Sequence, residues 1–236
     1  MDTRNQFSDN IPSRSSDEYA CIVANAPGEL TSAELHVLDS AHVVIAADGA
    51  VRKIPQDKRD VVVVGDFDSI SPSIVLSETF TRVNKPCQEE CSDIEKCIQH
   101  AIAQGIEKIK IVGAIGGRLD HSIVTIAMLV RYHPRLDISL FHNHSQTFAC
   151  SNLGGASGIY RISTAPDTPL SLIAWGNSST VTLSGVSWPL EMFELFCSSR
   201  GVSNRSNGTS VLLQVHSGVV ICVINATDDD KEDEIE

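Results

Sequence analysis

The sequence predicts an α/β fold: an N-terminal three-layer domain built on a parallel sheet, followed by a small all-β sandwich domain. In the first two-thirds of the chain, short apolar runs alternate with segments of helical periodicity. Near-continuous apolar runs are typical of strands buried on both faces of a parallel sheet. After about residue 145, short alternating strands follow one another with turn residues between them, which is typical of a sandwich.

The expected strands of the first part are 20–25, 42–48, 61–65, 108–114 and 137–143. A helix is expected to open at Ser92, because Glu95 stands three residues later as in a capping box, and to end near Gly105. A second helix is expected over 119–132, since His133-Pro134 would end it.

The expected strands of the second part are 158–163, 170–175, 179–185, 209–215 and 219–225. Asn207-Gly208 predicts a turn, and His216-Ser217-Gly218 predicts a hairpin. The whole chain is therefore divided into a disordered N-terminal segment (1–18), an α/β domain (19–145), a β-sandwich domain (146–227) and a disordered acidic tail (228–236).

Composition excludes some classes of function. The net charge is −12, of which the last nine residues carry −6 through seven acids and one lysine. No basic stripe is present, so no nucleic-acid partner is expected. No apolar run reaches membrane-spanning length and the N-terminus lacks a signal pattern, so we expect no membrane association and a cytoplasmic protein. The odd count of seven cysteines fits reduced thiols in that compartment.

Acidic residues follow several expected strands. Asp66 and Asp68 come directly after the apolar run 61–65, Asp48-Gly49 follows 42–48, and Asp93 opens a helix. Ligands of parallel α/β sheets bind outside the carboxyl ends of the strands. Two carboxylates this close repel unless a cation lies between them, and Mg²⁺ prefers oxygen ligands. The alternative is a solvated turn in which these acids cap helices.

A glycine-rich loop, 113–118, leads into the second helix. Its backbone N–H groups could cradle phosphate at Gly116 and Gly117, with a charged contact from Arg118. It is not a Walker loop, because no Gly-Lys-Ser/Thr follows. The alternative is an ordinary strand-to-helix turn, with Asp120 as a first-turn acid.

Trp188 stands before a proline where no strand pattern buries it. It either packs in the core of the β part or offers a stacking surface for a cationic ring. Ser203-Asn204 is either a turn or a hydrogen-bonding pair.

Taken together and in order, these motifs are more specific than any one of them. ADGA, GDFDSI, SDIEKC, GGRLDH, SGVSWPL and GVSN occur in this order between residues 47 and 204. The set resembles the thiamine pyrophosphokinase family over roughly residues 20–225. The resemblance implies transfer of a pyrophosphoryl group from Mg-ATP to the hydroxyl of thiamine, giving thiamine diphosphate and AMP.

The resemblance also implies the roles of individual residues. Asp66, Asp68 and Asp93 would bind Mg²⁺, and Asp48, Gly49, Gly116, Gly117 and Arg118 would line the nucleotide site. Asp93, Asp120, Trp188, Ser203 and Asn204 would contact thiamine. The catalytic set would be Asp66, Asp68, Asp93, Arg118 and Asp120. The α/β part would carry nucleotide and metal, while the β part would bind thiamine and form a homodimer with sites at its interface.

The chain departs from the family pattern at several positions. Ala50 replaces a usual glycine, Arg52 a usual asparagine and Glu95 a common threonine, and glutamates stand at 89–90. These departures concern substrate contacts more than metal binding. The alternatives are a metal-dependent phosphohydrolase with a DxD motif, a DxD glycosyltransferase, and a non-catalytic thiamine- or nucleotide-binding protein.

Overall fold

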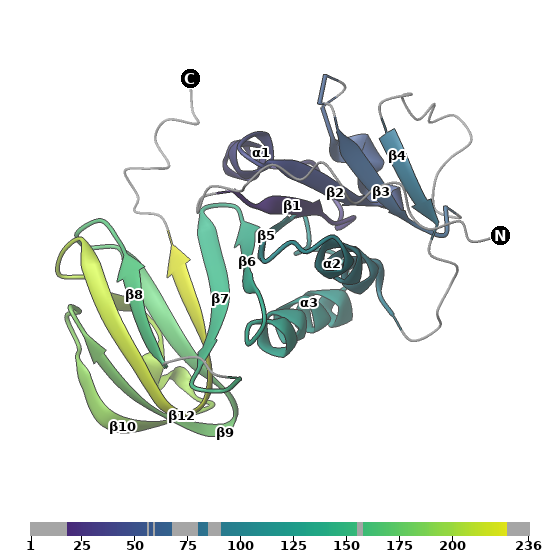
Figure 1. Cartoon of the computed structure of the whole chain (residues 1–236). Helices are drawn as coiled ribbons and strands as arrows, with labels where there is room; N and C mark the ends of the chain where they lie inside the picture. The colour runs from purple at the N-terminus through teal and green to yellow at the C-terminus, as the bar shows by residue number, and fades with distance from the viewer. Residues whose placement is uncertain are drawn as a thin grey trace.

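The structure is a computed structural model that describes residues 18–55, 57–58, 60–67, 80–84, 91–154 and 158–225 (Figure 1). The acidic tail at 228–236 lies outside the described residues, as does the N-terminal segment up to residue 17. Asp68 and the glutamates at 89–90 also lie outside them.

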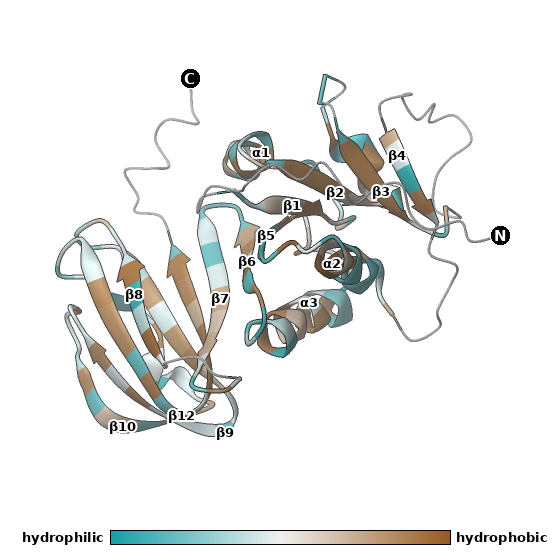
Figure 2. Ribbon diagram, viewed as in Figure 1, coloured by the Kyte–Doolittle hydropathy of each residue, from teal (hydrophilic) through white to brown (hydrophobic). Residues whose placement is uncertain are grey.

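The first part is a parallel sheet. Its strands are β1 (Ala20–Val23), β2 (Val43–Ala47), β3 (Val61–Gly65), β4 (Phe80–Asn84), β5 (Lys108–Val112) and β6 (Asp137–His142). They lie side by side in the order β6-β5-β1-β2-β3-β4, every neighbouring pair parallel. All five strands expected here are confirmed, and β4 was not predicted. Figure 2 shows β1, β2 and β3 apolar along most of their length, as strands covered on both faces require.

Helices cover both faces of this sheet. α1 (Ser32–Asp39) lies on one face, and α2 (Asp93–Ala103) and α3 (Leu119–Tyr132) lie on the other (Figure 1). A 3-10 helix, η1 (Asp48–Lys53), follows β2 directly. The bounds predicted for α3 are confirmed. α1 was not predicted, although Thr31 and Glu34 form the capping box that begins it.

Of the two hydrogen bonds of the capping box predicted for α2, only the one accepted by Ser92 forms. The Ser92 hydroxyl accepts a bond from the Glu95 N–H at 3.3 Å, as expected of an N-cap. The Glu95 carboxylate does not return to the cap. It accepts a bond from the Tyr132 hydroxyl at 2.9 Å and pairs with Arg131 at 2.8 Å. Glu95 is buried, so these partners from α3 satisfy it and fix the two helices together.

The second part is antiparallel. Its strands are β7 (Ser145–Ser151), β8 (Ile159–Ser163), β9 (Pro169–Ser184), β10 (Leu190–Phe196), β11 (Asn204–Arg205) and β12 (Ser210–Asn225), with a short 3-10 helix, η2 (Ser199–Gly201). β7, β10 and β11 were not predicted. The strands expected at 170–175 and 179–185 are the two halves of β9, and those expected at 209–215 and 219–225 are the halves of β12.

The hairpin predicted at His216-Ser217-Gly218 is therefore wrong. The chain stays in one strand there, and its register against β9 shifts on both sides of Ser217. Gly218 has φ +77° and packs against β9, where a Cβ would lie 2.5 Å from the Ser179 hydroxyl. A bulge of this kind bends a strand without ending it. The two halves of β12 accordingly have different neighbours, β8 for the first and β7 for the second.

The two parts share one continuous sheet, in which β7 pairs with β6 of the first part and with β12 of the second. Each part still has its own apolar cluster, the first around the parallel sheet and the second between the bent antiparallel strands. The division into two domains near residue 145 stays a prediction. None of the helices in the described part of the chain has the length and apolar character of a membrane span.

Candidate active site

A cavity of about 620 Å³ opens at the carboxyl edge of the parallel sheet. It lies between the loops after β1 and β5 and the first turns of α2 and α3. From β1 the strands follow one another outward in chain order through β2, β3 and β4, whereas β5 and β6 lie on the other side of β1. The strand order therefore reverses between β1 and β5, and α/β sheets usually bind ligands at such a point. Of the predicted site residues, Asp93, Gly116, Arg118 and Asp120 line the cavity.

Asp48 is buried at the end of β2. Its carboxylate accepts bonds from the backbone N–H of Gly49 at 2.6 Å and of Phe67 at 2.8 Å. Burial raises the pKa of Asp48, the two N–H bonds lower it, and the charges of Asp93 and Asp66 raise it further. Phe67 has φ +65°, a conformation that costs free energy for a side chain of this size. Asp48 thus holds the strained turn that carries Asp66.

Lys96 joins two of the predicted acids. Its ammonium nitrogen lies 2.9 Å from Asp93 Oδ1 and 3.5 Å from Asp66 Oδ2. The Lys96 side chain is almost fully buried. Burial lowers its pKa, but the bond to Asp93 and the charges of both acids outweigh that effect and raise it. The repulsion between carboxylates at this edge is therefore offset by a cation from the chain itself.

Lys96 was not among the site residues predicted from the sequence. The signal was present, because Lys96 follows Asp93 by three residues on α2 and so shares its face. Its second partner, Asp66, could be recognised only from the fold.

The glycine loop after β5 has a backbone conformation that favours glycine at two positions. Gly116 has φ +116° and Gly117 φ +72°, and a Cβ at Gly117 would lie 2.6 Å from Pro27. Both positions therefore favour glycine. Arg118 ends the loop, and its Nε donates to Asp120 Oδ1 at 3.1 Å. This contact lowers the pKa of Asp120 to about 2 and raises that of Arg118.

The acids fit a hard divalent cation by their chemistry, because carboxylate oxygens are its preferred ligands. Asp66 and Asp93 come together on Lys96, whereas the third predicted ligand, Asp68, lies outside the described residues. Among the residues that the structure describes, no three histidine, cysteine or carboxylate side chains form a metal-binding group. The complete metal site is thus a prediction.

Trp188 and Asn204 lie together in the antiparallel part. The Asn204 side chain accepts a bond from the Trp188 N–H at 3.1 Å and donates to the Trp188 carbonyl at 2.7 Å. The Trp188 side chain is 59% exposed, so it does not pack in the core. Ser203 has φ +64°, and its N–H donates to the Ser171 hydroxyl at 3.0 Å.

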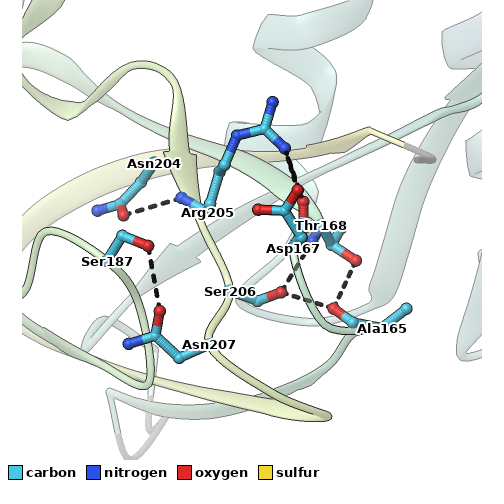
Figure 3. A network of polar contacts seen from close by, with 8 residues as sticks. All are labelled: Ala165, Asp167, Thr168, Ser187, Asn204, Arg205, Ser206 and Asn207. Carbon is cyan, nitrogen blue, oxygen red and sulfur yellow. Dashed lines mark hydrogen bonds and ion pairs between the residues drawn. The ribbon is translucent and has the colours of Figure 1, made fainter. Parts of the chain in front are cut away.

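A network of polar contacts supports this pair (Figure 3). Asn204 also accepts from the Arg205 N–H at 2.9 Å, and Arg205 pairs with Asp167 at 2.8 Å. Ser187, next to Trp188, donates to Asn207 at 3.1 Å (Figure 3). The backbone beside Trp188 is thereby fixed while its ring stays exposed. None of Trp188, Ser203 and Asn204 is among the described residues that line the cavity.

Comparison with known proteins finds a sequence match to the α/β part. Residues 35–140 match the sequence model of a protein family described as "Thiamin pyrophosphokinase, catalytic domain". Over this segment the chain is similar to the catalytic domain of thiamin pyrophosphokinases. A curated relative, thiamin pyrophosphokinase 1 of Caenorhabditis elegans, is 30% identical over an alignment of 123 residues, and the match covers 48% of this chain and 50% of the relative. The chain thus matches about half the length of that relative.

Solved structures of thiamin pyrophosphokinases share the fold over most of the chain. The Bacillus subtilis structure has a TM-score of 0.72 at 20% identity and covers 89% of this chain and 99% of its own. The yeast structure has a TM-score of 0.71 at 15% identity and covers 93% and 90%. The mixed α/β fold with its large sheet is therefore that of thiamin pyrophosphokinases.

Proposed function

We propose that this protein is an ATP-dependent thiamine pyrophosphokinase that makes thiamine diphosphate and AMP. The observation that carries this proposal is the meeting of Asp66 and Asp93 on Lys96, beside a cavity at the point where the strand order reverses. The match of residues 35–140 to the family's catalytic domain supports it.

In this reaction the hydroxyl oxygen of thiamine attacks the β-phosphorus of ATP. The bond from the β-phosphorus to the oxygen shared with the α-phosphate breaks, AMP leaves with that oxygen, and the hydroxyl proton is released. Such transfers depend on position and charge neutralisation more than on covalent chemistry of the protein. Asp120, which lines the cavity and pairs with Arg118, would help to orient the thiamine hydroxyl.

Asp66, Asp68 and Asp93 would hold Mg²⁺. A bound Mg²⁺ would neutralise charge on the phosphate oxygens of the transferred group. What the chain contributes is the positioning of the acids. Asp48 fixes the turn at Phe67, and Lys96 keeps Asp66 beside Asp93.

The nucleotide would lie along the sheet edge, beside Asp48-Gly49 and the loop of Gly116, Gly117 and Arg118. The N–H groups of a loop that opens a helix attract phosphate, and the exposed Arg118 adds a positive charge. Asp93, at the first turn of α2, would face both this nucleotide and thiamine.

Thiamine would stack on Trp188, near Ser203 and Asn204. These residues are outside the described lining of the cavity, and the Trp188 ring is exposed. Leu119 and Ile123 of α3 are exposed apolar residues, 73% and 51%, and each is a sequence neighbour of a residue that lines the cavity. Both features support a homodimer in which Trp188 of one copy completes the cavity of the other.

We also propose a cytoplasmic location, in keeping with the free thiols among the described cysteines.

The test is product analysis after the full chain is mixed with ATP, Mg²⁺ and thiamine, beside an Asp66→Asn variant. Asp137→Asn is the matched control, because Asp137 is an exposed acid that pairs with Lys108 at the opposite, amino end of the strands. Equal amounts of AMP and thiamine diphosphate, lost in Asp66→Asn and kept in the control, would support the proposal. Release of inorganic phosphate without thiamine diphosphate would favour the metal-dependent phosphohydrolase. Binding of thiamine without any product would favour a non-catalytic binding protein.

A further inference from the structure

Two buried side chains of opposite charge lie behind the loops that border the cavity. Glu34 on α1 is 3% exposed, and Lys53 at the end of η1 is 6% exposed. Neither lines the cavity or belongs to the site residues described above. Burying an ionised group costs free energy unless it is paired and hydrogen-bonded, so the contacts of these two residues indicate what they do.

Glu34 has two sets of contacts. Its Oε2 accepts from the Thr31 N–H at 3.0 Å and completes the capping box of α1. Its Oε1 points to the other side and accepts from the backbone N–H of Gly113 at 3.3 Å, with His142 Nδ1 at 3.7 Å. Gly113 is the first residue after β5 and begins the glycine loop. The second contact has no part in capping α1.

Gly113 is also bonded through its carbonyl. That oxygen accepts from the N–H of Ala26, in the loop after β1. The Ala26 carbonyl in turn accepts a bond from the Lys53 ammonium group. The charge of Glu34 also acts on Lys53, since it opposes the lowering of the Lys53 pKa that burial and Arg52 cause. Glu34, Gly113, Ala26 and Lys53 thus form a continuous chain of contacts from α1 to η1.

This chain holds together both loops that form one side of the cavity. Ala26 itself lines the cavity, and Ala114 and Gly116 follow Gly113 in the lining. Space at the junction is tight, because a Cβ at Gly113 would lie 2.9 Å from the Ala24 carbonyl and 2.9 Å from Leu30. A small shift at Gly113 would therefore move the loop N–H groups relative to the β1 loop.

We propose that Glu34 and Lys53 are positioning residues, a buried pair that fixes the β1 and β5 loops in the geometry needed to receive the phosphates of the nucleotide. This inference rests on the proposed function for the identity of the ligand. The positioning itself is a property of the chain without ligand. The two can therefore be tested separately.

The variants are Glu34→Ala, which removes both sets of contacts, and Thr31→Ala, which weakens the cap of α1 but leaves the Gly113 bond in place. The first readout is hydrogen exchange of peptides that cover residues 24–27 and 113–118, in the absence of ligand. We expect exchange in these loops to rise roughly tenfold in Glu34→Ala, since a buried N–H loses its acceptor, and to stay as in the wild type in Thr31→Ala. The second readout is steady-state kinetics, where KM for ATP should rise about fivefold or more in Glu34→Ala while kcat and KM for thiamine change less.

Equal effects of Glu34→Ala and Thr31→Ala on loop exchange and on KM for ATP would overturn the proposal, because Glu34 would then only cap α1. If Glu34→Ala does not fold by circular dichroism, Lys53→Met decides, since it keeps the apolar stem and removes only the bond to Ala26. Faster loop exchange in folded Lys53→Met supports the pair, and unchanged exchange refutes it. If the wild type makes no thiamine diphosphate, the exchange readout still decides the positioning role, and that failure belongs to the proposed function alone.

Discussion

Gly65 and Asp48 are packed so closely that a Cβ on Gly65 would lie 2.5 Å from the carboxyl carbon of Asp48. The last residue of β3 thus provides the space for the buried acid at the end of β2. Asp48 in turn fixes the turn that carries Asp66.

Gly65→Ala is therefore expected to lower stability by about 1–3 kcal/mol, the usual cost of overpacking, and to lower kcat/KM because Asp48 must move. Urea unfolding and steady-state kinetics measure the two effects. Gly208→Ala is the matched control, since nothing lies within 4 Å of a Cβ there. If Gly65→Ala behaves like the control in both measurements, the close contact with Asp48 contributes neither to stability nor to activity.

Lys96→Met tests the internal cation between the two acids. Without Mg²⁺ the free energy of unfolding of the variant is expected to be about 1–2 kcal/mol lower, because Asp66 and Asp93 then lie close together without a counter-charge. Solvent screening at the partly exposed Asp93 limits the effect to this size. Mg²⁺ should then raise Tm more in the variant than in the wild type, since it restores the missing positive charge. Thermal unfolding with and without Mg²⁺ measures this. Lys58→Met, which removes a lysine bonded to carbonyls at the end of α1, should show no added response to Mg²⁺.

Arg118→Gln tests the state of Asp120. Loss of the guanidinium should return the pKa of Asp120 from about 2 toward its ordinary value near 3.8. Because the folded-state pKa is lowered, the contribution of this pair to stability is present above about pH 4 and is lost as pH falls toward 2. A ¹³C NMR titration of the Asp120 carboxyl would measure the change, and an unchanged midpoint in the variant would rule out Arg118 as its cause.

Trp188→Ala tests the exposed ring. With 59% of the side chain exposed, removal should leave stability nearly unchanged. KM for thiamine should rise roughly five- to thirtyfold, as expected for the loss of a cation–π contact, while KM for ATP stays close to the wild-type value. Trp175→Ala, which changes a second partly exposed tryptophan of the same antiparallel part, is the control. If KM for thiamine rises equally in the two variants, Trp188 does not contact thiamine.

The sequence predicted the parallel sheet well because its signals are local. β-branched runs gave β3, and helical spacing ended by His133-Pro134 gave the bounds of α3. β9 and β12 were each read as two strands, because Gly176 and Gly218 resemble turn residues and only pairing with a neighbour turns such a break into a bulge. α1 is eight residues long and its amphipathic pattern is weak, so it was missed.

The candidate site was predictable to the extent that it depends on strand ends. Asp48, Asp66, Asp93 and Arg118 each lie at the edge of the sheet where their position in the sequence placed them. The residues that hold them could not be found this way. Lys96 contacts Asp66 thirty positions away, and Glu34 contacts Gly113 across 79 positions, so both partners are set by the fold.

In the proposed reaction, both outer phosphates of ATP move to thiamine as one group. The most direct measurement follows ATP labelled with ³²P at the β position, and in a parallel reaction at the γ position, in the presence of Mg²⁺ and thiamine. Both labels are expected to appear in thiamine diphosphate in equal yield, with unlabelled AMP as the other product. Label from the γ position alone in a thiamine monophosphate, or release of either label as inorganic phosphate without thiamine diphosphate, would contradict it.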